Sequence, residues 1–192
     1  MHIRINIPHW GWQEYLSGMK ALISLDSAKF NSMLLDEVKS FYECKEVHLL
    51  SSARYGLMLA IKHLGLEGKN IAVPGYVCPV VLRAVEKANA NPVPIDVLSG
   101  SVAFDISKLA KVVQSNEISG ILAPNSYGID QDIKSLSQLG IPVIEDAAYQ
   151  AGISTSQLPE LCGLRTGAGL WSFNFKALNS VGGGILFTTE KL

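Results

Sequence analysis

The chain has 192 residues, of which 48% are hydrophobic and 17% charged, and its formal net charge is −1. This composition predicts a well-packed globular domain and argues against a protein that binds nucleic acid or an anionic membrane. The three cysteines are far apart and the four histidines are scattered, so we expect neither disulfides nor a metal site. Because residues 1–5 lack an apolar signal core and no apolar run reaches about 18 residues, we expect a cytoplasmic chain.

The N-terminal residues through Trp10 and Trp12 show no clear period. Exposed tryptophans are uncommon, so this arm is expected to pack on its own domain or, slightly more readily, on a partner chain. A helix is expected from Asp26 to Tyr42, because Asp26 or Ser27 can cap it and apolar residues recur on one face. We therefore assign residues 1–35 to an interface arm and helix, and residues 36–192 to one larger domain.

Short apolar runs then alternate with helical patterns, and several runs are flanked by Pro, Gly or Asn as strand ends often are. The expected strands are 47–50, 71–73, 92–95, 118–123, 142–145, 169–173 and 185–188, and the expected helices between them are 53–64, 79–89, 106–115 and 129–139. Runs that are apolar on both faces suit a parallel sheet covered by helices. We predict an α/β fold in three layers, with a seven-stranded, mostly parallel sheet and helices on both faces.

Polar or turn-forming residues follow several of these strands. They are Ser51, Pro74, Asn125 and Asp146. Ligands of open α/β sheets bind in the crevice at the carboxyl ends of the strands, so these residues are expected to converge on one crevice.

Ser51-Ser52-Ala53-Arg54 joins the first expected strand to a helix. The free amides of a helix N-terminus bind phosphate, and the two hydroxyl groups would add donors. The alternative is an ordinary helix cap, which also favours serine.

Asp146 ends an apolar strand, and Lys176 follows thirty residues later in a segment that is otherwise apolar or neutral. A carboxylate can hold a protonated pyridine nitrogen, and a lysine can form a Schiff base with an aldehyde, which together suit pyridoxal phosphate. The alternatives are a helix-capping Asp146 and a surface Lys176. The glycines at 182–184 predict a turn where backbone approaches backbone or a ligand.

The order of these features resembles the DegT/DnrJ/EryC1/StrS family of sugar aminotransferases, which belong to pyridoxal-phosphate fold type I. The resemblance runs from about Asp36 to the C-terminus. It rests on Glu145-Asp146-Ala147-Ala148, on Trp171-Ser172-Phe173 followed by Lys176 and Gly182-Gly183-Gly184, on residues 73–79, and on Asn125-Ser126-Tyr127-Gly128.

The resemblance implies the large domain of fold type I aminotransferases and the cofactor pyridoxal 5'-phosphate. Asp146 would pair with the pyridine nitrogen, and Lys176 would form the Schiff base and shuttle protons. Backbone amides of Ala53 and Arg54 and the hydroxyl of Ser172 would hold the phosphate. The expected cofactor-binding residues are Ser52, Ala53, Arg54, Tyr76, Cys78, Asn125, Asp146, Tyr149 and Ser172, and the expected catalytic residue is Lys176.

The sequence departs from the family pattern at several points. The spacing from Ser172 to Lys176 is one residue short, and Cys78 stands where many members place an aromatic residue, with Tyr76 nearby. Tyr149 occupies a position where Gln or His often contacts the cofactor. The sequence ends at Leu192, whereas members continue into a smaller C-terminal domain that covers the site.

The resemblance implies transfer of an amino group from glutamate or glutamine to a keto sugar carried on a nucleotide, by a dimer with active sites at its interface. The alternatives are an inactive relative that acts as a binding or structural protein, or one half of a split enzyme whose C-terminal half is a separate chain. A third alternative is dehydration with the same cofactor, against which lysine rather than histidine at position 176 counts.

Overall fold

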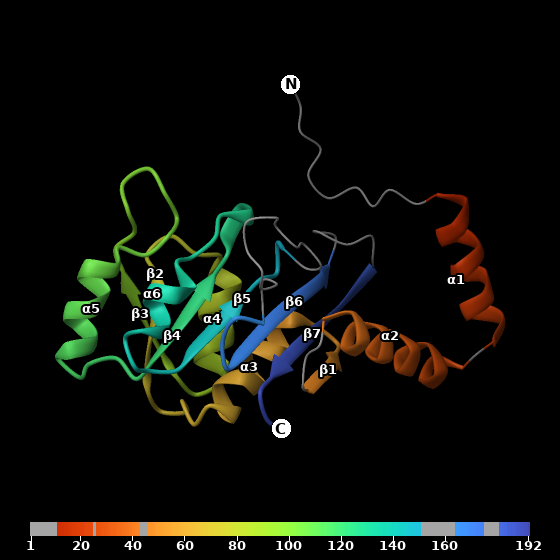
Figure 1. Cartoon of the computed structure of the whole chain (residues 1–192), viewed down its shortest axis with the longest axis horizontal. Coiled ribbons are helices and arrows are strands. Elements are labelled where there is room, and N and C mark those ends of the chain that lie inside the picture. Colours follow the sequence, from red (N-terminus) through yellow and green to blue (C-terminus); the bar gives the residue numbers. More distant parts are fainter. Residues whose placement is uncertain (1–10, 25, 43–45, 151–163, 175–180) are drawn as a thin grey trace.

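The structure is a computed structural model that describes residues 11–24, 26–42, 46–150, 164–174 and 181–192. Within these residues seven strands form one sheet, in the order β1-β7-β6-β5-β4-β2-β3 (Figure 1). Strand β7 is antiparallel to both of its neighbours, β1 and β6, and the remaining neighbours pair in parallel. The expected seven-stranded, mostly parallel sheet is confirmed.

The strands are β1 (Glu46–Leu50), β2 (Asn70–Pro74), β3 (Asn91–Ile95), β4 (Gly120–Pro124), β5 (Val143–Asp146), β6 (Ala168–Asn174) and β7 (Val181–Thr188). The helices are α1 (Trp12–Ser24), α2 (Ser27–Tyr42), α3 (Ala53–His63), α4 (Pro79–Lys87), α5 (Ile106–Gln114) and α6 (Ile133–Ser137), with a 3-10 turn at Ser126–Gly128. Each expected strand is present within a few residues of its predicted bounds. The proposed domain boundary between residues 35 and 36 stays a prediction, and α2 runs across it.

The helix expected over residues 129–139 is shorter than predicted. Asp132 caps α6, since its Oδ1 accepts a hydrogen bond of 3.1 Å from the backbone N of Ser135, so the helix begins at Ile133. Just before it, Gln131 is buried and its side chain donates to the backbone oxygens of Pro124 and Val102. These contacts fix residues 129–131 as a connection rather than a helical turn.

Helix α1 was missed by the sequence prediction, which found no clear period through Trp12 and assigned no element between there and Asp26. Apolar residues recur along the helix at the spacing of one helical face: Trp12, Tyr15, Leu16, Met19, Leu22 and Ile23. The side chain of Glu14 also reaches back to the N-terminus of the helix, where its Oε2 accepts a hydrogen bond of 2.7 Å from the backbone N of Gly11. This is half of a capping box, and together with the spacing it could have predicted the helix.

The hydrophobic core lies on both faces of the sheet, because alternate strand residues point to opposite sides. On one face Ile71, Val73 and Leu122 pack with residues of α3 and α4. On the other face Ala72, Ile121 and Val143 pack with residues of α5 and α6. A third cluster joins Trp171 of β6 to β1, β7 and Val38 of α2.

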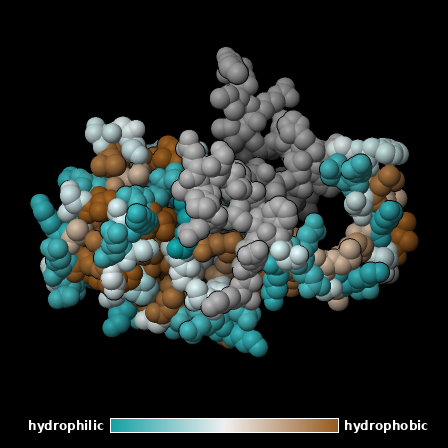
Figure 2. All heavy atoms as spheres, viewed as in Figure 1, coloured by the Kyte–Doolittle hydropathy of each residue, from teal (hydrophilic) through white to brown (hydrophobic). Residues whose placement is uncertain are grey.

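The N-terminal helices differ from the rest of the chain. Helix α2 buries Val38 against the sheet, whereas α1 buries no residue and stands away from the sheet in Figure 1. Figure 2 shows apolar residues at the surface of this arm. Among the described residues, no helix is both long and apolar enough to cross a membrane.

Candidate active site

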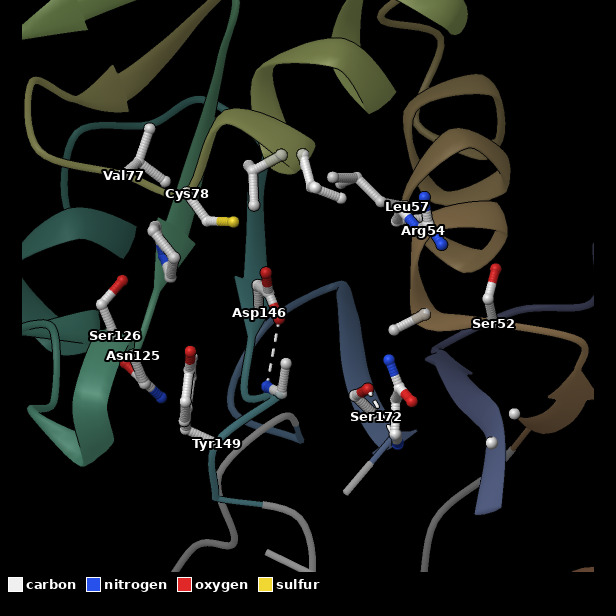
Figure 3. Close-up of a pocket in the computed structure, with 18 of the residues that line it drawn as sticks. Ser52, Arg54, Leu57, Val77, Cys78, Asn125, Ser126, Asp146, Tyr149 and Ser172 are labelled. Carbon is white, nitrogen blue, oxygen red and sulfur yellow. Dashed lines mark hydrogen bonds between the residues drawn. The ribbon is translucent and has the colours of Figure 1, made fainter. Parts of the chain in front are cut away.

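A cavity of about 490 Å³ lies at the carboxyl ends of the parallel strands (Figure 3). Its walls come from the segments that follow β1, β2 and β4, from the ends of β5 and β6, and from the beginning of β7. This is the crevice in which open α/β sheets bind ligands, and its volume is in the range of small-molecule sites. Ser51, Asn125 and Asp146 converge on it as predicted, but Pro74 is buried and is not part of its wall.

One end of the cavity is the N-terminus of α3. Ser51, Ser52, Ala53 and Arg54 all line it. Ser52 caps the helix, because its Oγ accepts a hydrogen bond of 3.3 Å from the backbone N of Tyr55. The capping role is therefore present, and it leaves the amides of the first helical turn at the cavity, where an anion could bind.

Glycines bring the start of β7 against this end of the cavity. A Cβ on Gly184 would lie 2.6 Å from the backbone N of Ala53 and 2.8 Å from the backbone O of Trp171, so no other residue fits without displacing backbone. Gly182 and Gly183 line the cavity and have positive φ angles of 149° and 95°. The glycine run thus lets β7 approach both β6 and α3, so the predicted close approach of backbone is confirmed. The predicted turn is wrong, because residues 182–184 belong to strand β7.

Asp146 is the last residue of β5 and lies in the middle of the cavity wall. Figure 3 places it between Tyr149 on one side and Ser52 and Arg54 on the other. Its Oδ1 accepts a hydrogen bond of 3.0 Å from the backbone N of Ala148. This local bond orients the carboxylate, which is half-buried and borders the cavity.

Ser172 borders the same cavity from β6. It is buried, and its Oγ accepts a hydrogen bond of 3.3 Å from the backbone N of Asn174, which also lines the cavity. Lys176, the expected catalytic residue, lies outside the described residues, so its role stays a prediction.

Tyr76 and Cys78 were both expected to bind the cofactor, but they differ in their position relative to the cavity. Cys78 is exposed and lines the cavity, with its sulfur pointing inward in Figure 3. Tyr76 does not line the cavity, and its Oη lies 3.5 Å from the Oη of Tyr127. The structure therefore brings Cys78, and not Tyr76, to the cavity wall.

Asn125 lines the cavity but is fully buried and bound to the scaffold. Its Nδ2 donates a hydrogen bond of 3.0 Å to Oε1 of Glu145, and its Oδ1 accepts one of 3.0 Å from the backbone N of Gln131. These bonds hold the segment after β4 against β5.

Tyr149 lines the cavity beside Asp146 and is partly exposed. Partial burial raises the pKa of its phenol, and the nearby Cys78 and Asp146 raise it further. The hydroxyl is therefore a neutral hydrogen-bond donor at physiological pH. Gln150, the next residue, is buried, and its Nε2 donates to the backbone O of Gly128 over 3.1 Å.

Arg165 was missed by the sequence prediction. Its guanidinium makes two hydrogen bonds to Oε1 of Glu145, one of them 3.0 Å long from Nε, and Nη2 lies 3.3 Å from Oδ1 of Asp130. Glu145 is 0% exposed. A glutamate inside an apolar strand indicates a buried partner, but the sequence does not tell which cation provides it.

Solved structures share this fold. An aminotransferase from Psychrobacter cryohalolentis is 20% identical, with a TM-score of 0.82, and the match covers 95% of this chain and 48% of that chain. A GDP-4-keto-6-deoxy-D-mannose-3-dehydratase from E. coli, with hydrated PLP bound, is 17% identical with a TM-score of 0.87, over 99% of this chain and 52% of that chain. DesV of S. venezuelae, in complex with a ketimine intermediate, is 21% identical with a TM-score of 0.74, over 97% of this chain and 54% of that chain.

These matches define the fold as that of the large domain of fold type I aminotransferases, and the chain spans about half the length of the structures it matches. The model of the DegT/DnrJ/EryC1/StrS aminotransferase family matches residues 23–192. The chain belongs to this family, and the resemblance found in the sequence is confirmed.

Proposed function

We propose that this chain is the cofactor-binding part of a pyridoxal-phosphate-dependent aminotransferase that moves an amino group from glutamate or glutamine to a keto sugar carried on a nucleotide. The observation that carries the proposal is Asp146, which ends β5 in the wall of a cavity that has the N-terminus of α3 at one end. Family membership supports the reaction class.

The lining residues fit the shape and charge of pyridoxal phosphate. The amides at the start of α3 and the Arg54 side chain suit the phosphate. Asp146 suits a protonated pyridine nitrogen, and Tyr149 offers a neutral hydroxyl to an oxygen on the ring. In Figure 3, Tyr149 lies on one side of Asp146, and Arg54, at the start of α3, lies on the other. This suits pyridoxal phosphate, because its ring oxygen and its phosphate lie on opposite sides of the ring nitrogen.

When bound, pyridoxal phosphate supplies a ring that withdraws electrons from the α-carbon of an amino acid. The Asp146 carboxylate would keep a proton on the ring nitrogen. The first turn of α3, Ser52 and Ser172 would hold the phosphate and so orient the ring. Lys176 Nζ, proposed from the family pattern, would attach the cofactor and move a proton at the donor's α-carbon.

We further propose that the chain works in the cytoplasm as a homodimer or with a complementing C-terminal half. The widely spaced cysteines suit a reducing compartment. The exposed apolar face of α1 supports association, since exposed apolar patches of this kind mark interfaces.

The same helix favours a second candidate function, in which the chain binds cofactor but turns over substrate only with another chain. Under this candidate the chain would bind pyridoxal phosphate and yet show little transamination alone.

The cofactor proposal is tested by adding pyridoxal phosphate to the purified chain and recording the visible spectrum. Borohydride reduction followed by peptide mass mapping should place the pyridoxyl group on Lys176. Lys39 and Lys62 are exposed and serve as internal controls for non-specific labelling. Labelling confined to such surface lysines would contradict the assignment.

The role of Asp146 is tested with Asp146→Asn. The amide cannot hold the ring proton, so the variant should retain some cofactor and lose nearly all reaction with an amino donor. Asp132→Asn is the matched control, because Asp132 caps α6 and does not line the cavity. If Asp146→Asn forms aminated cofactor at the parent's rate, Asp146 only orients its own turn.

A further inference from the structure

Three tyrosines lie side by side next to the cavity. The ring centroids of Tyr76 and Tyr127 are 6.4 Å apart, and those of Tyr127 and Tyr149 are 5.9 Å apart. Their exposed fractions are 58%, 63% and 37% in the same order along the row. Because Tyr149 also lines the cavity, this tyrosine platform (Tyr76, Tyr127 and Tyr149) continues the cavity wall toward the outside.

The backbone holds the central ring in an unfavourable conformation. Among the described residues, the non-glycine residues with positive φ are Asn89, Asn116 and Tyr127, and asparagine enters this region at small cost. Tyr127, with a φ of 58°, does not share that advantage. Strain of this kind is retained where the surrounding structure enforces it, and it gathers at functional sites.

Hydrogen bonds to buried polar groups hold Tyr127 in this backbone conformation. The backbone N of Gly128 donates to the backbone O of Asn125 over 3.3 Å, and the backbone O of Gly128 accepts from Nε2 of Gln150 over 3.1 Å. Asn125 in turn is bound to Glu145, which Arg165 holds. These hydrogen bonds therefore fix the turn that carries Tyr127 on its buried side, and the aromatic ring of Tyr127 is exposed to solvent.

The chemistry of the platform suits a neutral, hydroxylated ring. Aromatic faces carry partial negative charge and attract the C–H groups on one side of a sugar ring. Tyr76 and Tyr127 share one hydrogen bond between their hydroxyl groups, so one O–H and several lone pairs remain for a ligand. Successive rings are tilted by 33° and 32°, so the three faces do not form one flat surface.

The charge of the side chains argues against a diphosphate on the platform. Among the described residues that line the cavity, Arg54 is the one cation, and it belongs to the end formed by α3. Figure 3 shows Tyr149 on the opposite side of Asp146 from Arg54. The three side chains of the tyrosine platform carry no positive charge, so they offer an anionic group no ion pair.

We propose that the tyrosine platform binds the hexose ring of the amino acceptor and holds it at the mouth of the cavity, so that its keto carbon faces inward. This inference rests on the proposed function, because it assigns the surface that selects a sugar as acceptor. The platform acts by contact with the hexose ring, and its three tyrosines take no part in proton transfer.

Saturation-transfer NMR on the full chain tests the proposal, with thymidine diphosphate glucose as the probe and thymidine diphosphate as its comparison. Saturation should reach the hexose protons. Dissociation constants are then measured for the parent chain and for Tyr127→Gly, Tyr127→Phe and Tyr76→Ala. Tyr55→Ala is the matched control, since Tyr55 is exposed on α3 and does not line the cavity.

Tyr127→Gly separates binding from folding. Glycine relieves the positive φ, so the melting temperature should stay or rise, while the dissociation constant for the nucleotide sugar should rise roughly five- to tenfold because the ring is lost. Tyr127→Phe keeps the ring and should bind within about twofold of the parent. Tyr55→Ala should bind as the parent does.

The proposal is overturned if saturation reaches the base protons but not the hexose, if no transfer is seen, or if Tyr127→Gly binds as the parent does. A Tyr127→Phe variant that loses as much affinity as Tyr127→Gly would also overturn it, because the hydroxyl and not the ring face would then carry the contact. All variants are also tested for the visible band formed with pyridoxal phosphate. Absence of that band in the parent defeats the proposed function, whereas a normal band with unchanged sugar binding defeats only the platform.

Discussion

Helices α1 and α3 share a pattern of apolar residues along one face, but only the apolar face of α3 is covered by other parts of the described chain. Both place apolar residues along one helical face. In α3, Leu57, Ala60 and Ile61 are buried against the sheet. In α1 the equivalent face is exposed, and Trp12 and Ile23 are 77% and 76% exposed. Periodicity thus determines where a helix forms, whereas its stability comes from the surface against which it packs.

The two regions should therefore respond to mutation in different ways. In the sheet domain, apolar contacts and buried polar bonds contribute to the free energy of unfolding. In α1 we expect the same residue types to contribute to association instead.

The largest contrast is expected between two tryptophans. Trp171 is 2% exposed and packs edge to face on Phe187 at a centroid distance of 4.7 Å. Trp171→Ala should lower the free energy of unfolding by about 3–5 kcal/mol, because it opens a cavity in the core. Trp12→Ala should change it by less than about 0.5 kcal/mol. Denaturant unfolding at low protein concentration measures both, and equal effects would remove the distinction between the regions.

Polar groups should show the same contrast. Arg165→Met leaves Glu145 buried without its cation and should cost about 3–5 kcal/mol of the free energy of unfolding. Lys108→Met breaks an ion pair of 2.6 Å with Asp96 in which both side chains are largely exposed, and it should leave the unfolding midpoint unchanged. A small effect of Arg165→Met in thermal melting would mean that water, rather than Arg165, stabilises the Glu145 carboxylate.

Much of the fold could be predicted from the sequence. Strands that are apolar on both faces identified the parallel sheet, and the residues after them identified the crevice. Helix α1 was missed although Trp12, Leu16 and Met19 are spaced as a helix requires. Its beginning was hard to predict because no serine or aspartate precedes it as a cap. Instead, the Glu14 side chain accepts a hydrogen bond from the backbone N of Gly11.

The site was predictable where local sequence sets the geometry. Asp146 ends β5, and Ser52 caps α3 just after β1, so the order of the elements places both at the crevice. The partners of Glu145 were not predictable, because Arg165 and Asn125 are each 20 residues away and meet it only in the folded chain. The tyrosine platform likewise joins residues from three separate segments, after β2, β4 and β5.

The apolar face of α1 can be tested directly for a role in self-association. If its apolar face is an association surface, replacing both Leu22 and Ile23 by Glu should raise the dissociation constant for self-association by about tenfold or more, without changing monomer stability. Gln13→Glu adds a negative charge outside this apolar stripe and is the control. Light scattering across a concentration series measures the change. A parent chain that stays monomeric at all concentrations would contradict the association surface.

The smallest contrast is expected between two helix caps. Ser52 caps α3 and Asp26 caps α2, where its Oδ1 accepts a hydrogen bond of 3.0 Å from the backbone N of Lys29. Ser52→Ala should lower the free energy of global unfolding by about 1 kcal/mol, because α3 is packed into the core and unfolds with it. Asp26→Ala should leave global unfolding nearly unchanged and instead speed amide exchange in the first turn of α2, since that turn lies outside the core and opens locally. Hydrogen exchange with and without denaturant distinguishes the two, and a global loss from Asp26→Ala equal to that from Ser52→Ala would show that the N-terminal helices and the sheet unfold as one unit.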